Sequence, residues 1–218
     1  MKKINSIFDQ NPDINKNAYL NWAMQPYSDY QNSIAIAEGY AMAAIELTKD
    51  LLDDNSMHRA DKIIFPVLFS INQSIELYLK TIYNMMEDID DKKISNFTHH
   101  DIRQLANETF AKIRKQEGNS EEFNVLVKDL TGYINDIYKF LDLENGGKFN
   151  ALDFTRYPTD NKNNPHFYVE TNENVVINLE VLLRTFQKTW DCLSQLEAMY
   201  SARLDYINDC RSEYWSNN

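Results

Sequence analysis

The stretch that decides the fold is residues 63–86, which read IIFPVLFSINQSIELYLKTIYNMM. Apolar side chains recur every three or four positions along one face of a helix: Leu68, Ile71, Ile75, Leu79, Ile82 and Met86. The opposite side carries Gln73, Glu76 and Lys80, with aromatic residues mixed among them. A helix that is apolar nearly all round is usually buried nearly all round. We therefore expect the central helix of a bundle here, with Pro66 either kinking it or marking its first turn.

Most of the remaining chain shows the same helical period, because only five Gly and five Pro interrupt it. Helices are expected at about residues 31–53, 56–87, 98–115 and 120–140, and from 179 onward for more than thirty residues. The candidate N-caps of these helices are Ser56, Thr98 with Asp101, Ser120 and Asn178. The predicted fold is all-α, an up-and-down bundle of five to six helices with a long C-terminal helix.

Two segments lack the helical period. Residues 1–30 are rich in Asn and Asp with scattered aromatic residues, so we expect an N-terminal arm that packs through its rings. A helical domain over residues 31–212 follows it. Residues 166–177 contain two short runs of β-branched and aromatic residues around a polar turn, which predicts a small β-hairpin insertion.

The charge balance is acidic, since 33 Asp and Glu against 22 Lys and Arg among 218 residues give a net charge of −11. This argues against non-specific nucleic-acid binding, which depends on clustered basic residues, and favours a protein partner with a basic surface. Cys192 and Cys210 lie about 27 Å apart on one predicted helix, too far to pair. No apolar run approaches the roughly 20 residues that span a bilayer, and the N-terminus lacks the apolar stretch of a signal peptide. We expect a cytoplasmic protein without a membrane segment.

Common nucleotide-binding and zinc motifs are absent, so we expect neither a cofactor nor a metal site. Glu76 and Lys80 have the favourable spacing for a helical ion pair, either on the surface or enclosed by aromatic side chains. His100, favoured over His99 as the inward residue, is either a polar first-turn residue or an acid/base or phosphate contact. Arg156 either locks its loop against a carboxylate such as that of Glu76, or grips a ligand carboxylate or phosphate.

Three segments together resemble bacterial proteins of the HEPN superfamily, whose name stands for higher eukaryotes and prokaryotes nucleotide-binding. They are FPVLFSINQSIELYLK at residues 65–80, HDIRQL at 100–105 and FTRYP at 154–158. The resemblance implies a bundle of four or five helices and frequent homodimerisation. It also implies a role in toxin–antitoxin, abortive-infection or other phage-conflict systems.

Active members of that superfamily are metal-independent ribonucleases with an Arg-x(4–6)-His motif and a site assembled across the dimer. In this chain the only close pair of that order, Arg156 and His166, has nine residues between its members. The resemblance therefore implies a binding or regulatory protein that lacks the standard ribonuclease motif. Its expected binding residues are Gln73, Glu76, Lys80 and Tyr157.

Two alternatives remain open. One is a divergent metal-independent endoribonuclease in which His100 is the acid/base and Arg156 contacts the scissile phosphate, while Glu76 and Lys80 set their positions. The other is a nucleotide-binding module with a local pocket near Arg156 and Lys80. The expected assembly, implied by the resemblance, is a homodimer.

Overall fold

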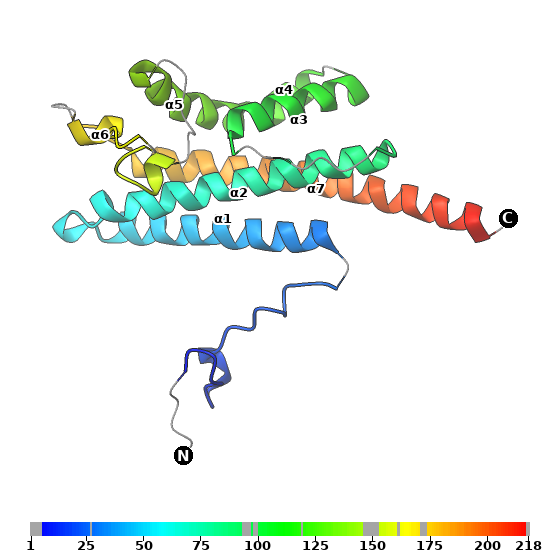
Figure 1. Ribbon diagram of the computed structural model, residues 1–218, viewed down its shortest axis with the longest axis horizontal. Helices are drawn as coiled ribbons and strands as arrows, with labels where there is room; N and C mark the ends of the chain where they lie inside the picture. Colours follow the sequence, from blue (N-terminus) through cyan, green and yellow to red (C-terminus); the bar gives the residue numbers. More distant parts are fainter. Residues whose placement is uncertain are drawn as a thin grey trace.

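The computed structural model describes residues 6–26, 28–92, 97, 100–118, 120–145, 153–160, 162–170 and 174–216. Helices α1 (Asp29–Asp53) and α2 (Ala60–Ile89) form an antiparallel pair, and α7 (Leu179–Ser216) lies along them, with its C-terminal end extending beyond both (Figure 1). On the other side of α2 lie α3 (Ile102–Glu117), α4 (Glu121–Leu126) and α5 (Lys128–Asn145). The short helix α6 (Phe167–Glu170) precedes α7. The all-α helical bundle with a long last helix is thus confirmed.

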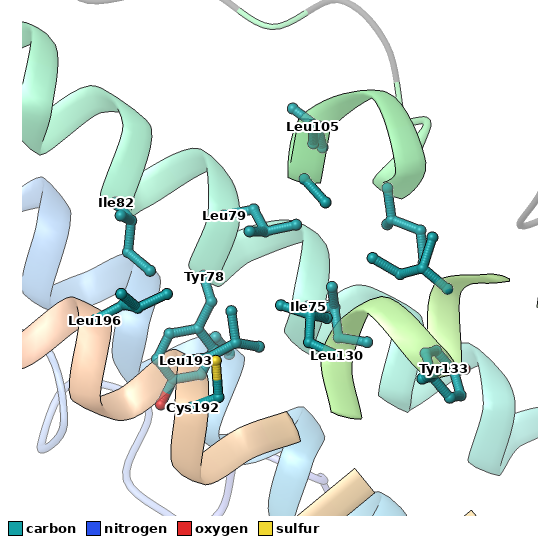
Figure 2. Close-up of a cluster of buried hydrophobic side chains, with 14 of the residues drawn as sticks. Ile75, Tyr78, Leu79, Ile82, Leu105, Leu130, Tyr133, Cys192, Leu193 and Leu196 are labelled. Atoms are coloured by element: carbon teal, nitrogen blue, oxygen red, sulfur yellow. The ribbon is translucent and has the colours of Figure 1, made fainter. Parts of the chain in front are cut away.

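Helix α2 lies at the centre of the bundle, because it contacts α1, α3, α7 and the 3-10 turn η3 (Asp153–Thr155). Figure 2 shows a cluster of fully buried side chains from four helices: Ile75 and Leu79 of α2, Leu105 of α3, Leu130 of α5 and Leu193 of α7. Burying each such side chain stabilises the fold by about 1.5–3 kcal/mol. The apolar side chains that recur every three or four positions in residues 63–86 therefore form the centre of the core. Since α2 begins at Ala60, Pro66 lies inside the helix and does not mark its first turn.

Two predicted N-caps, Ser120 and Asn178, are confirmed by side-chain hydrogen bonds to the first turn of their helices, while α3 is capped by Asp101, which was expected at the third position of a capping box that starts at Thr98. The bonds run from the Gln104 N–H to Asp101 (2.9 Å), from the Phe123 N–H to Ser120 (3.1 Å) and from the Val181 N–H to Asn178 (3.1 Å). These caps fix where α3, α4 and α7 begin, since each satisfies an N–H that has no partner within the helix. Thr98, the other half of the predicted capping box, lies outside the described residues.

Two helix boundaries differ from the prediction. Ser56 does not cap α2 but opens the 3-10 turn η2 (Ser56–His58), and Asn55 accepts the Ala60 N–H at 2.8 Å instead. The single helix expected over residues 120–140 is divided at Val127, whose backbone leaves helical geometry. The break lets α4 place Phe123 against the Phe110 ring of α3, with ring centroids 5.7 Å apart, while α5 packs on α7.

The structure does not show the predicted β-hairpin. Phe167–Glu170, expected as the first strand, form α6, residues 174–178 are irregular, and residues 171–173 lie outside the described part. Two ring pairs hold α6 in place: Phe167 with Phe154 (centroids 5.5 Å apart) and Tyr168 with Phe65 (5.1 Å). These tertiary contacts override the strand preference of the aromatic and β-branched residues.

The N-terminal arm, residues 6–26, does not pack on the bundle through its rings. It leads away from the start of α1 (Figure 1), and the residues Phe8 and Trp22 are 82% and 77% exposed. Trp22 stacks on Tyr19, with centroids 5.2 Å apart. Gln25 and Asn32 join the arm to α1, since the Asn32 side-chain amide pairs with both backbone groups of Gln25.

Helix α7 spans 38 residues, which confirms the long C-terminal helix. It carries both cysteines as free thiols, Cys192 buried and Cys210 exposed. In the part of the chain that the structure describes, none of the helices combines the length and apolar character needed to cross a membrane.

Candidate functional site

The predicted site residues lie on or beside one face of α2. Phe69, Gln73, Glu76 and Lys80 follow one another at intervals of four, three and four residues, which puts them on a single stripe of the helix. Segments distant in sequence cover this stripe, including the loop around Arg156 and the residues just before α3. The polar side of α2 is therefore partly buried, as its mixed composition predicts.

Glu76 is the centre of the stripe. Its side chain is 5% exposed, and its Oε1 accepts hydrogen bonds from Lys80 Nζ and His100 Nδ1, each at 2.7 Å. Lys80 is itself mostly buried, so this pair is enclosed and does not lie on the surface. Oε2 is buried and accepts no hydrogen bond from the described residues. Two donors on one oxygen compensate part of the cost of taking the carboxylate out of water.

His100 is fixed at one nitrogen and open at the other. Its side chain is 58% exposed although Nδ1 is bound to the buried carboxylate. An ionised carboxylate only accepts hydrogen bonds, so Nδ1 is the donor and Nε2 is left to exchange a proton or bind an anion. A carboxylate that orients an exposed imidazole is the arrangement that general acid–base chemistry uses. His99 lies outside the described residues.

Phe97 completes the surroundings of the pair and was missed by the sequence analysis. The Lys80 ammonium lies 6.0 Å from the centroid of the Phe97 ring, and that ring meets Tyr83 edge-on at 5.2 Å. Aromatic rings around an ion pair exclude water and strengthen it. The available signal was a single aromatic residue in a mostly polar linker, which is too weak to indicate a partner.

Arg156 is held by its own loop and by Phe69. Its guanidinium lies 6.0 Å from the Phe69 ring centroid and 5.0 Å from that of Tyr157, and Nη2 donates to the Tyr157 hydroxyl at 3.1 Å. The nearby carboxylate is that of Asp153, at 3.9 Å, so the expectation that Arg156 locks onto Glu76 is wrong. The Arg156 side chain is 46% exposed, and most of its five N–H donors stay available to a ligand.

The two groups that would contact a phosphate stand apart along the helix. His100 is tied to Glu76 and Arg156 to Phe69, which are seven residues or about 10 Å apart along the axis of α2. Half-buried Gln73 lies between these anchor points. We call the surface formed by Gln73, Glu76, Lys80, His100, Arg156 and Tyr157 the α2 face. Its geometry suits an extended ligand better than a single phosphate gripped from two sides.

The loop that presents Arg156 is built around His166, the histidine of the widened Arg-to-His pair. Burial lowers the pKa of His166, and the charges of Asp153 and Asp160 oppose this shift only in part. Its backbone N–H donates to Pro158 O at 3.0 Å, and its ring stacks on that of Tyr168. His166 is therefore a buried, neutral support of the loop, whereas Arg156 is exposed.

The start of α3 is fixed by a contact that the sequence did not reveal. The Tyr138 hydroxyl of α5 donates to Asp101 Oδ1 at 2.6 Å, and the Arg103 guanidinium lies 4.1 Å from the Tyr138 ring centroid. Burial and the Asp101 carboxylate raise the pKa of Tyr138. Because Asp101 directly follows His100, this anchor on α5 also positions the imidazole.

Within the described residues, no three His, Cys, Asp or Glu side chains gather closely enough to hold a metal ion. The chain matches no known family model, no curated protein and no solved structure. The resemblance to the HEPN superfamily therefore stays a prediction. Function has to be inferred from the geometry of the α2 face.

Proposed function

We propose that the protein is a HEPN-like binding or regulatory protein of a bacterial or phage conflict system, working in the cytoplasm and contacting RNA or a nucleotide through the α2 face. The observation that supports this most is the buried Glu76 carboxylate, which holds His100 toward solvent while Arg156 stays exposed farther along the same face. An imidazole and a guanidinium on one face are suited to bind phosphate oxygens.

The charge of the whole chain limits where such a ligand binds. With a net charge of −11, most of the surface repels phosphates, so the contact is confined to the few cations of the α2 face. The distance of about 10 Å between the anchor points of His100 and Arg156 favours a ligand with more than one phosphate. An RNA strand fits this better than a mononucleotide.

Binding to total tRNA, measured by filter retention, tests the proposal. His100→Ala and Arg156→Ala should each weaken binding about three- to tenfold, since each removes a contact to phosphate. Arg184→Ala is the matched control, because Arg184 is an exposed arginine of α7 outside the α2 face. Equal affinity of all four proteins, or the same loss in the control, would overturn the proposal.

A divergent metal-independent endoribonuclease is the second candidate, favoured by the 2.7 Å contact between Glu76 Oε1 and His100 Nδ1. In that mechanism His100 Nε2 takes the proton of a ribose 2′-hydroxyl, whose oxygen bonds to the adjacent phosphorus as the bond to the 5′-oxygen breaks. The products are a 2′,3′-cyclic phosphate and a 5′-hydroxyl that takes its proton from water, while an arginine stabilises the charge on the phosphate under attack. In a homodimer the second copy supplies this arginine, which removes the problem of the separation within one chain. Cleavage of tRNA in the presence of a chelator, lost in both alanine variants, would support this candidate, and intact tRNA with wild type would remove it.

A nucleotide-binding module is the third candidate, favoured by the exposed and mostly unused donors of Arg156. A ligand at 100 times its dissociation constant stabilises the folded state by about 2.7 kcal/mol. Thermal unfolding with ATP, GTP and cyclic nucleotides measures this directly. A melting temperature unchanged by every nucleotide would remove this candidate.

The assembly is also part of the proposal. We expect a homodimer and a protein partner with a basic surface, the latter because acidic and basic surfaces attract each other over long range. Sedimentation velocity over a range of concentrations tests the homodimer. A chain that stays monomeric throughout would contradict it.

A further inference from the structure

A polar cavity of about 600 Å³ lies away from the α2 face, between the start of α1, the second half of α2 and α7. Asp29 and Tyr30 line it from α1, Asn84 from α2, and Asp205 and Asn208 from α7. Its volume falls within the range of ligand-binding cavities in proteins. Of the α2 face only Lys80 reaches it, and that ammonium is already bound to Glu76.

The charges around this cavity are mostly negative. Asp29, Asp88 and Asp205 line it, and within the described residues Asp29 and Asp205 form no ion pair. Asp88 is bound by Arg211 of α7, whose Nη1 lies 3.3 Å from Oδ1. Burial, together with the charges of Asp88 and Asp29, raises the pKa of Tyr30 to about 12. The cavity therefore attracts cations and repels phosphates.

Two polar side chains in the wall of the cavity lack hydrogen-bond partners among the described residues. Thr81 is only 4% exposed, and no described residue bonds its hydroxyl. The Asn84 Oδ1 atom is also buried without a donor. Thr81 lines the cavity, so its hydroxyl is open to a partner from outside the chain, whereas the Asn84 oxygen is enclosed by protein atoms.

The apolar part of the lining is Leu77, Met85 and Leu204, and the polar residues Ser28, Gln31, Ser33 and Ser201 complete the wall. Met85 and Leu204 are buried and Leu77 is partly so. An arginine or lysine side chain matches such a lining, because its aliphatic stem packs on apolar atoms while its head meets carboxylates. A guanidinium matches best, since it carries five donors and no acceptor, and both the carboxylates and the Thr81 hydroxyl oxygen can accept.

We propose that this cavity receives an arginine side chain from the basic surface of a partner protein. The inference goes beyond the RNA contact, because it assigns a second binding surface whose ligand is positively charged, whereas RNA is negatively charged. It places the proposed basic partner on residues of α1, α2 and α7 that, apart from Lys80, lie outside the α2 face.

Fluorescence anisotropy of a labelled Gly-Arg-Gly-Arg-Gly peptide with the full chain tests the proposal. The double variant Asp29→Asn/Asp205→Asn should weaken binding about tenfold, since it removes the two unpaired carboxylates. The control Glu46→Gln/Asp53→Asn removes the same charge from exposed positions of α1 outside the cavity and should change affinity less than about twofold. Equal losses in both double variants, or no binding by wild type, would overturn the proposal.

A third variant tests the role of the cavity without changing its charge. Thr81→Val keeps the net charge and nearly the same volume, and it should weaken the peptide about threefold by removing a buried hydroxyl. Circular dichroism confirms that each variant folds, and unchanged affinity of a folded Thr81→Val protein would contradict the assigned cavity. Binding of tRNA should be the same in Asp29→Asn/Asp205→Asn as in wild type, and peptide binding should survive in His100→Ala. Failure of the RNA proposal and failure of this one are therefore distinguishable.

Discussion

The Glu76 carboxylate joins two segments that are 24 residues apart, because the same Oε1 accepts from Lys80 within α2 and from His100 just before α3. This single atom both stabilises the fold and orients the exposed imidazole. The consequences of changing it are therefore expected in stability as well as in binding.

Glu76→Gln should lower the free energy of unfolding by about 1–3 kcal/mol, because a neutral amide replaces the acceptor of two charge-assisted hydrogen bonds in a mostly buried place. Urea denaturation measures the change. Glu46→Gln is the control, since Glu46 is exposed on α1, and it should stay within about 0.5 kcal/mol of wild type. A Glu76→Gln protein as stable as wild type would show that the cluster does not hold the bundle together.

Because the His166 side chain is buried, we expect the folded protein to lose stability in mild acid. Its pKa in the folded state is lowered by burial, so below the ordinary value of about 6.5 the unfolded chain binds a proton that the folded chain does not. The stability present at neutral pH should therefore fall as the pH drops through 6.5 toward the folded pKa. Asp54 and Asp90 also have lowered pKa values, but their contributions are lost only below about pH 4. Denaturation at pH 7.5 and 5.5 should give a smaller difference for His166→Gln than for wild type, and equal differences would contradict this account.

Contacts between single residues were predicted correctly where the partners are close together in the sequence. The four-residue interval between Glu76 and Lys80 predicts their pairing, and His100 was expected to be the inward histidine at its helix start, as its contact with Glu76 shows. For Arg156, a contact with Glu76 was one of the alternatives, whereas its guanidinium lies near the Phe69 ring and Asp153. Nothing in the sequence tells which turn of α2 a distant loop will cover, since that depends on how η3 and α6 pack.

At the scale of elements, α7 places two chemically different thiols on one helix. Burial raises the pKa of Cys192 to about 12, while Cys210 is exposed near the free end of the helix. A thiol with a raised pKa has almost no reactive thiolate at pH 8. Ellman's reagent should thus modify one thiol per native chain and two after unfolding. Cys210→Ser should abolish the native reaction, and rapid modification of Cys192 in that variant would contradict the packing of α7.

Two helix starts were predictable because caps act within three residues, as Ser120 and Asn178 show. The hairpin was not, because the aromatic and β-branched composition of residues 167–169 indicates a strand while ring contacts to η3 and α2 stabilise one turn of helix. The break at Val127 likewise depends on the fit of Phe123 against α3. Elements whose conformation depends on tertiary contacts are only weakly indicated by their own amino-acid sequence.

At the scale of the whole molecule, the N-terminal arm adds exposed apolar surface but no core. None of its described residues is buried. Deleting residues 1–24, which leaves Gln25 and its contact with Asn32, should shift the melting temperature by less than about 2 °C. Differential scanning calorimetry measures this, and a large decrease would mean that the arm packs on the bundle after all.

The acidic surface and the two proposed contacts divide the molecule by charge. The α2 face presents Arg156 and His100 to phosphates, and the cavity between α1, α2 and α7 presents Asp29 and Asp205 to a cation. One chain of net charge −11 is thereby suited to join an RNA or nucleotide to a basic protein. Such a bridging role agrees with a regulatory protein better than with a general nucleic-acid binder.

The most direct test of the RNA contact is the salt dependence of the affinity for a single-stranded RNA oligonucleotide. Each phosphate contact contributes about 0.7 to the slope of log affinity against log salt for single strands. Arg156→Ala should reduce the slope by about that amount relative to wild type, whereas Arg184→Ala should leave it unchanged. Identical slopes for the three proteins, or a slope near zero for wild type, would contradict the account.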